Sequence, residues 1–468
     1  MEIIANLLNN IESFMGTALI FLLFGTGLFF SLKLGFIQFR KFIPSFKQVF
    51  GGMFSKKNQE HGSLSSFQAL ATAIAAQIGT GNVAGVASAI LAGGPGAVFW
   101  MWVSALLGMS TIFAEAVLAQ HYRDKKDGEF VGGPAYYISK GVGGNLGKFL
   151  AGFFAVMITL ALGIIGNMVQ SNSIAGAVNE AFGLPTWIMG VFIAIAAALI
   201  FIGGVSRIGK FAETVVPVMA VIYLLASLFV IIKFSGQLIP TLELIIKSAF
   251  SGTAVMGGIV GASVKEAMKL GAKRGLFSNE AGMGSTPHAH AVAKVRHPAE
   301  QGLAAMCGVF IDTVLVCTST AMVILVTQSY LVENPASSTG YFEAAMLTQQ
   351  AFHIALGGVG KPFLAICLTF FAFTTVVGWY YFGESNIKYL FGTKALPIYR
   401  IIVVAAIIFG SIQKVAVVWL LSDVANEFMV VPNLIALILL SGQVKSIMND
   451  YQRQLDEGGE IKYNYLIK

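Results

Sequence analysis

Long apolar stretches alternate with polar connections along the whole chain. Eleven of these stretches reach the length of a membrane span, with approximate limits at 14–33, 64–93, 96–120, 149–181, 185–205, 211–234, 250–273, 302–328, 361–389, 398–414 and 417–442. A spanning helix needs about 20 apolar residues, and lipid offers no hydrogen bonds to an irregular backbone. The pattern therefore predicts an all-α polytopic membrane protein with 11 transmembrane helices.

The order of the spans divides into one leading helix and two equal halves. Residues 1–63 hold the leading helix and an inside loop, and residues 64–234 and 250–442 hold five spans each. Residues 235–249 connect the halves on the outside, and residues 443–468 form a cytoplasmic tail. Because five is odd, the second half crosses the membrane in the opposite sense, which predicts an inverted repeat.

Glycines interrupt the first span of each half at matching places. The first half has Gly79-Thr80-Gly81, and the second half has Gly257, Gly258 and Gly261. Glycines also serve close helix packing in membranes, which is the alternative explanation. Adjacent glycines weaken a helix, however, and paired interrupted helices are the best sequence sign of a transporter site. We therefore predict two broken helices.

Composition and charge agree with a membrane protein. The chain is 56% hydrophobic and 11% charged, with a mean hydropathy of +0.76, and its three cysteines form no CxxC pair. With the N-terminus outside, 26 of the 30 Lys and Arg residues fall in inside loops or the tail. This bias predicts a cell-membrane protein with a cytoplasmic C-terminus and explains the net charge of +7 without nucleic acid. No obligatory protein partner is evident.

A broken membrane helix can bind ions and small molecules. Its free carbonyls suit sodium, and the N–H groups of the resumed helix suit a carboxylate. The stretch QIGTGNVAG at 77–85 does not match a dinucleotide fingerprint, because its spacing is GxGxxxG and no strand precedes it. We expect Na⁺ as the coupling ion and no organic cofactor.

Two further polar faces lie within apolar spans. Phe371, Thr374 and Thr375 lie at i, i+3 and i+4 on one helical face, although threonines also bond back to their own helix. Asn167 and Gln170 share another face, which serves either a ligand or interhelical hydrogen bonds.

Asp312 is the most deeply placed ionisable residue and is either a proton site or a structural hydrogen-bonding group. No carboxylate lies in either predicted break. This favours sodium held by neutral oxygens over proton coupling.

Three stretches identify a family resemblance. GGPGAVFWMW at 93–102, QIGTGNVAG at 77–85 and KRGLFSNEAGMGS at 273–285 resemble the alanine or glycine:cation (sodium) symporter family. The resemblance covers nearly the whole chain. It implies sodium-coupled uptake of a small amino acid by a LeuT-type fold of the amino acid-polyamine-cation superfamily, with one extra helix in front.

The resemblance also implies roles for individual residues. Sodium would be held by the carbonyls of Ala75, Ile78 and Phe371 and the hydroxyls of Thr374 and Thr375, and Asn82 corresponds to a ligand of a possible second sodium. The substrate would contact Gln77, Gly79, Thr80, Gly81 and Thr375, with Gly257, Gly258 and Gly261 across from them, while Asn167, Gln170 and Trp379 would limit its side chain.

The stretch KRGLFSNEAGMGS has two possible places. Its basic surroundings, Lys265, Lys269, Lys273 and Arg274, favour the cytoplasmic end of the second broken helix. There Phe277, Ser278, Asn279 and Glu280 would form a cytoplasmic gate. The alternative puts FSN at the substrate.

Alternating-access symport of alanine or glycine is the function that these patterns favour. A channel would need neither paired breaks nor inverted halves. An enzyme would need a metal or nucleophile constellation, and the sequence has none.

Overall fold

The computed structural model describes residues 2–52, 64–126, 128–251, 263–335, 337 and 340–465. Helices dominate the described residues, and the strands are very short. The parallel pair β1 (Leu64–Ser65) and β4 (Ala293–Lys294) joins two distant segments, and β2 (Asp124–Lys126) forms a hairpin with β3 (Glu129–Val131).

The α-helices are α1 (Glu2–Lys33), α2 (Ile37–Arg40), α3 (Phe42–Gly52), α4 (Ser66–Gln77), α5 (Val86–Gly93), α6 (Gly96–His121), α7 (Pro134–Tyr137), α8 (Gly144–Ile158), α9 (Asn167–Phe182), α10 (Thr186–Phe201), α11 (Gly204–Lys233), α12 (Leu238–Ser251), α13 (Val264–Asn279), α14 (Pro287–Ala291), α15 (Pro298–Val309), α16 (Thr318–Val326), α17 (Ala344–Leu356), α18 (Gly360–Phe391), α19 (Leu396–Ser411) and α20 (Val415–Glu457). The π-helical segments are η1 (Gly81–Gly85), η2 (Ile138–Val142), η3 (Thr159–Gly166) and η5 (Phe310–Cys317), and the 3₁₀ turns are η4 (Ser235–Gln237), η6 (Ser329–Leu331), η7 (Gly357–Val359) and η8 (Thr393–Ala395).

The described residues contain eight helical runs long and apolar enough to cross a membrane, or nine when the bent pair formed by α4 and the helix 81–93 counts as one span. The apolar helix α10 is shorter, with 16 residues. The protein is therefore a helical polytopic membrane protein, and the predicted total of 11 spans exceeds what these runs provide.

The first predicted break is present. α4 ends at Gln77, a π-helical segment begins at Gly81, and the two parts of the span are bent by 47°. Ser65 and Gln68 form a capping box that fixes the start of α4. Residues 67–87 are almost entirely buried, so the break lies inside the bundle.

The predicted broken helix of the second half, 250–273, falls partly outside the described residues. α12 ends at Ser251 and α13 starts at Val264, and the predicted glycines Gly257, Gly258 and Gly261 lie outside the described residues. The limit predicted for this span at residue 273 is too early, because α13 continues to Asn279 and is buried there.

A non-helical, buried segment follows α13. Residues 280–286 separate α13 from α14, and Glu280, Gly282 and Gly284 adopt positive φ within it. This segment is the interruption that the structure shows in the second half of the chain. Its glycines Gly282 and Gly284 have the same GxG spacing as the first break, but they lie beyond the limit predicted for this span at residue 273.

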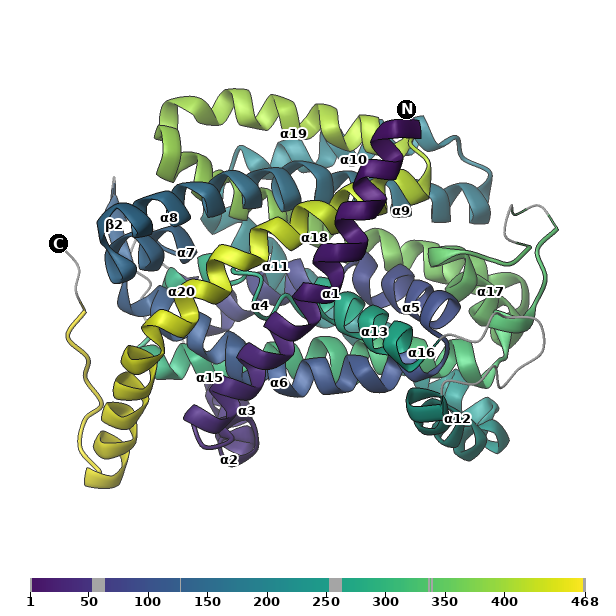
Figure 1. Ribbon diagram of the computed structural model, residues 1–468. Coiled ribbons are helices and arrows are strands. Elements are labelled where there is room, and N and C mark those ends of the chain that lie inside the picture. The colour runs from purple at the N-terminus through teal and green to yellow at the C-terminus, as the bar shows by residue number, and fades with distance from the viewer. Residues whose placement is uncertain are drawn as a thin grey trace.

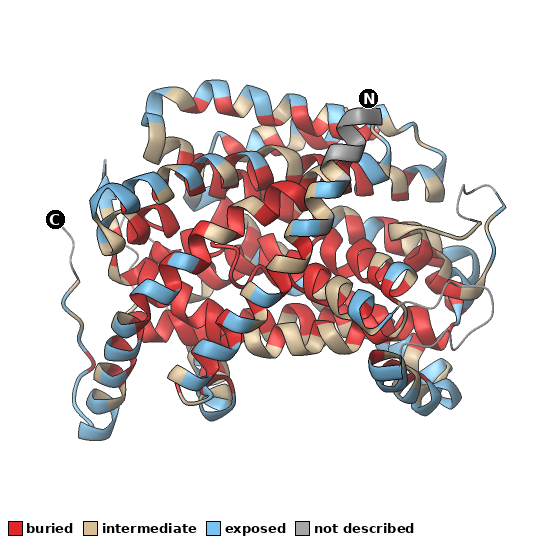
Figure 2. Cartoon of the chain, viewed as in Figure 1, coloured by how far each residue is buried: buried red, intermediate tan, exposed pale blue. Residues whose placement is uncertain are grey.

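The buried centre of the bundle is surrounded by apolar faces that point outward. Figure 2 shows buried residues filling the middle and exposed ones along the outer helices. Large apolar side chains such as Phe192 and Ile401 are exposed, as expected for surfaces that face lipid. Figure 1 shows the leading helix α1 crossing α20 at the front, and the two helices pack together.

Candidate functional site

The break after α4 is tied to neighbouring groups through its backbone. The Gly79 N–H donates to Asn82 Oδ1 at 2.8 Å, and the Thr80 N–H donates to Gln170 Oε1 of α9 at 3.1 Å. The N–H groups of the break are thus partly satisfied by side-chain amides. A buried break needs such partners because no water replaces the lost helical bonds.

Three carbonyl groups converge on the hydroxyl of Thr375. Its Oγ1 lies 3.1 Å from the Ala75 oxygen, 3.3 Å from the Ile78 oxygen and 3.2 Å from the Phe371 oxygen. A hydroxyl has one hydrogen, so it can satisfy only one of these acceptors fully. Thr374 Oγ1 donates to the same Phe371 carbonyl at 2.8 Å. The predicted sodium residues therefore do come together around one point.

Glycine at position 79 allows this approach. A Cβ there would lie 2.3 Å from Thr375 Oγ1 and 3.1 Å from Gln170 Oε1. Any side chain would push α18 away from the break.

Four buried polar atoms beside the break lack a hydrogen-bond partner. They are Gln77 Oε1, Thr80 Oγ1, Asn167 Oδ1 and Gln170 Nε2. Leaving a buried polar atom unpaired costs about 1–3 kcal/mol, and native proteins rarely do so without a reason. The set contains acceptors and donors, which together complement both ends of a zwitterion.

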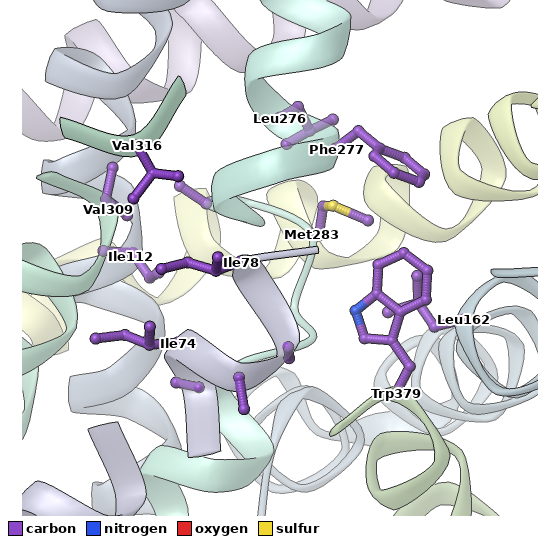
Figure 3. Packing of buried hydrophobic residues seen from close by; sticks show 14 of the residues in the cluster. Ile74, Ile78, Ile112, Leu162, Leu276, Phe277, Met283, Val309, Val316 and Trp379 are labelled. Atoms are coloured by element: carbon purple, nitrogen blue, oxygen red, sulfur yellow. The ribbon is translucent and has the colours of Figure 1, made fainter. Parts of the chain in front are cut away.

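Trp379 closes one side of this region. Figure 3 shows Trp379 on α18 facing Phe277 and Met283 across the site, and the two aromatic rings are T-shaped at 5.6 Å. Its Nε1 donates to Glu280 Oε1 at 2.5 Å. A Cβ at Gly166 would lie 2.5 Å from the indole ring, so the ring is fixed from both sides.

The residues predicted to form a cytoplasmic gate pack against the first break. A Cβ at Gly81 would lie 3.0 Å from Ser278 Cα and 3.2 Å from the Phe277 ring. Gln77 Nε2 donates to the Asn279 carbonyl at 2.6 Å. The structure thus places FSN against the first break and inside the bundle.

The basic residues misled the sequence interpretation because they are neutralised. Lys273 Nζ lies 2.6 Å from Glu12 and 3.1 Å from Asp423, and Arg274 Nη1 lies 2.9 Å from Asp423. Partners from α1 and α20 let these charges stay buried. Neither partner is close to them in sequence.

Comparison with known proteins decides the family. The model of the sodium:alanine symporter family matches residues 1–465. The chain belongs to the sodium:alanine symporter family. The sodium/alanine symporter AgcS of Methanococcus maripaludis is 45% identical over 94% of this chain and 96% of its own length. The amino-acid carrier protein AlsT of Bacillus subtilis is 42% identical over 98% of this chain and 94% of its own.

The chain is also similar to a solved manganese transporter of Eremococcus coleocola. It has a TM-score of 0.49 and 15% identity over 86% of this chain and 78% of that one. The family therefore rests on the sequence relatives. Membership makes the chain a transporter and not an enzyme. Within the described residues, no group of three or more His, Cys, Asp or Glu side chains could hold a metal ion.

Two buried carboxylates of this symporter adjoin the site, although neither lies in a break that the sequence predicted. Glu280 lies in the segment after α13, and Asp312 lies in η5. Asp312 Oδ1 accepts from Asn82 Nδ2 at 2.6 Å. Asn82, proposed above as a ligand of a second sodium, therefore uses both ends of its amide in protein hydrogen bonds. An ionisable residue inside a span is the signal that marks Asp312.

Three π-helical segments of the symporter border the site. η1 follows the first break, η3 ends directly before Asn167, and η5 contains Asp312. The segments η1 and η5 pack on each other. Such segments are rare and often occur at functional sites, so their position supports the choice of this region.

Proposed function

We propose that this protein carries a small neutral amino acid, alanine or glycine, into the cell together with sodium by alternating access. The relatives named as sodium/alanine symporters support the substrate class and the coupling ion. The unpartnered polar atoms around the first break support the location of the binding site there. The single observation that carries the proposal is the convergence of three carbonyls on Thr375 next to those atoms.

In the proposed sodium site, the ion lies among the oxygens of Ala75, Ile78, Phe371, Thr374 and Thr375. Sodium in transporters of this kind is coordinated by carbonyls of unwound helices. The ion would take over the acceptors that one hydroxyl hydrogen leaves unsatisfied. The approach of α18 to the break then depends on the ion as well as on Gly79.

In the proposed substrate site, the carboxylate lies at the break near Gly79, Thr80 and Gly81. Thr80 Oγ1 and Gln170 Nε2 have hydrogens to offer it, and Gln77 Oε1 and Asn167 Oδ1 can accept from the ammonium group. Trp379 and Phe277, whose rings are in contact, would limit the side chain of the substrate. The contacts of Gly257, Gly258 and Gly261 with the substrate stay a prediction. In the proposed site, Phe277–Glu280 also lie opposite the first break.

The proposed architecture is two inverted five-helix halves preceded by α1, with the N-terminus outside. The end of α13, directly before the interruption at 280–286, contacts the first break, as is expected for two broken helices of an inverted repeat. Glu12 near the start of α1 contacts Lys269 and Lys273, so these residues belong to the outer side in this orientation. Most of the 30 basic residues still remain inside.

Uptake into proteoliposomes tests the function. Labelled alanine should accumulate above its equilibrium level only when an inward sodium gradient is imposed, and collapse of the gradient should release it. Accumulation without the gradient would refute sodium coupling. Flux that only dissipates an existing alanine gradient would indicate a channel.

Removing the Thr375 hydroxyl tests the sodium site. We expect Thr375→Val to raise the sodium concentration for half-maximal uptake about tenfold or more, because one ligand is lost. Thr369→Val is the matched control, since Thr369 is on the same helix and bonds only the Ala365 carbonyl. Equal sodium curves for the two variants would remove Thr375 from the site.

A further inference from the structure

Asp312 is a fully buried carboxylate surrounded by hydrogen-bond donors. Besides Asn82, Ser278 Oγ donates to it at 2.9 Å and Thr313 Oγ1 donates at 2.7 Å. Donors from three different elements stabilise an ionised carboxylate. The arrangement therefore gives a carboxylate in the interior of the bundle three hydrogen-bond donors.

The positive charges of the neighbouring elements turn away from this carboxylate. On α13, Lys273 and Arg274 pair with Glu12 and Asp423. Among the described residues, no Lys, Arg or His nitrogen lies within ion-pair distance of Asp312. The ionisable groups on or next to elements packed against η5 include Cys317 of η5 itself and Glu280 and Glu115 near the second interruption. They also include Glu300 of α15, which pairs with Arg296, and Glu213 of α11, which accepts from Gln68.

One side-chain amide connects Asp312 to the first break. Asn82 Nδ2 donates to Asp312 Oδ1, while Asn82 Oδ1 accepts from the Gly79 N–H. Gly79 directly follows Ile78, whose carbonyl points at Thr375. The carboxylate is thus one amide away from the carbonyls of the proposed sodium site.

Those carbonyls and hydroxyls carry no formal charge. Moving a cation from water into a low-dielectric interior is costly unless an opposite charge lies nearby. We propose that Asp312 is the fixed negative charge that offsets this cost for the transported sodium. Asn82, which bonds to both, fixes the backbone of the break relative to this carboxylate. The inference rests on the proposed function, because it concerns the ion of that site. It assigns Asp312 a positioning and electrostatic role without direct contact with the ion.

Neutralising the carboxylate in the full-length protein tests the inference. In proteoliposomes at saturating alanine, Asp312→Asn should raise the sodium concentration for half-maximal uptake at least about tenfold, which equals about 1.4 kcal/mol. At saturating sodium, the alanine concentration for half-maximal uptake should change less than about threefold. A purely structural role would instead alter both values or the maximal rate.

Four further variants complete the test and separate charge from hydrogen bonding. Thr313→Val removes one donor but keeps the charge, so its sodium dependence should stay near that of the wild type. The double variant D312N/T313D returns a carboxylate next to the lost one and should recover much of the sodium affinity. Asp312→Ser is a second neutral variant with the same expectation if D312N does not elute as a folded, monodisperse protein. Glu213→Gln controls for neutralising a carboxylate away from the break.

The outcomes distinguish the two proposals. If the wild type shows no sodium dependence, the proposed function fails. If the wild type is sodium-dependent and D312N keeps the same sodium half-saturation, only the role of Asp312 is overturned. An equal loss of sodium affinity in T313V and D312N would overturn it as well.

Discussion

Gly79→Ala should abolish sodium-driven alanine uptake. The added methyl group would lie 2.3 Å from Thr375 Oγ1 and 3.0 Å from Thr375 Cβ, both on a rigid helix. α18 and the break would have to separate, and the carbonyls of Ala75 and Ile78 would lose their contact with the hydroxyl. We expect uptake below about one hundredth of the wild-type rate, because misplacement by about 1 Å can cost a hundredfold.

Gly85→Ala is the matched control for this change. Gly85 lies in the same interrupted span, but a Cβ there meets no atom of another residue closer than 3.8 Å. Its uptake should stay within about threefold of the wild type. Comparable activity of G79A and G85A in the same proteoliposome measurement would contradict the close approach as the basis of the site.

Arg274→Gln should give the largest loss of stability. Arg274 donates two bonds to Asp423 at 2.9 and 3.1 Å, and its guanidinium lies 4.4 Å from the centre of the Trp419 ring. Removing one partner of a buried ion pair costs about 3–5 kcal/mol because the other charge stays buried. Lys273 also contacts Asp423, so we expect the loss of unfolding free energy to lie near the lower end of this range. Thermal unfolding in detergent, followed by loss of the monodisperse elution peak, measures the effect.

Lys247→Gln removes an ion pair at the surface and serves as the comparison. Lys247 and Glu243 are both well exposed, and such pairs contribute little to stability because water screens them. The midpoint of unfolding should hardly change in this variant. Arg274→Lys keeps the charge but not the paired hydrogen bonds to Asp423, so its unfolding midpoint should lie between those of R274Q and K247Q. An unfolding midpoint of R274Q equal to that of K247Q would show that the buried pair adds nothing.

Local patterns were enough to predict the first break, whereas its neighbours followed from the family resemblance. The glycines at 79 and 81 mark the interruption, and the i, i+3, i+4 spacing puts Phe371, Thr374 and Thr375 on one face. Contact between Thr375 and the carbonyls of Ala75 and Ile78 was expected and is present. The sodium role of these residues remains a proposal.

The second interruption could not be predicted in the same way. Lys273 and Arg274 look like residues of an inside loop, since a lone buried charge is very costly. Their partners Glu12, Asp423 and Glu427 come from the two ends of the chain, and no local pattern connects them. The sequence therefore placed Phe277 and its neighbours at the cytoplasmic end of a helix and not beside the first break, although the residues themselves were recognised.

The π-helical segment η3 bears on how the site can change between its states. A π-helical hydrogen bond spans one residue more than an α-helical bond, and each residue of an α-helix turns the chain by about 100°. If η3 took up α-helical bonding, α9 would rotate by about that angle relative to α8. Distances between spin labels on α9 and α4, measured with and without sodium, would reveal such a turn. The amides of Asn167 and Gln170 would then leave the break together, and the amino acid would lose both of them in one step.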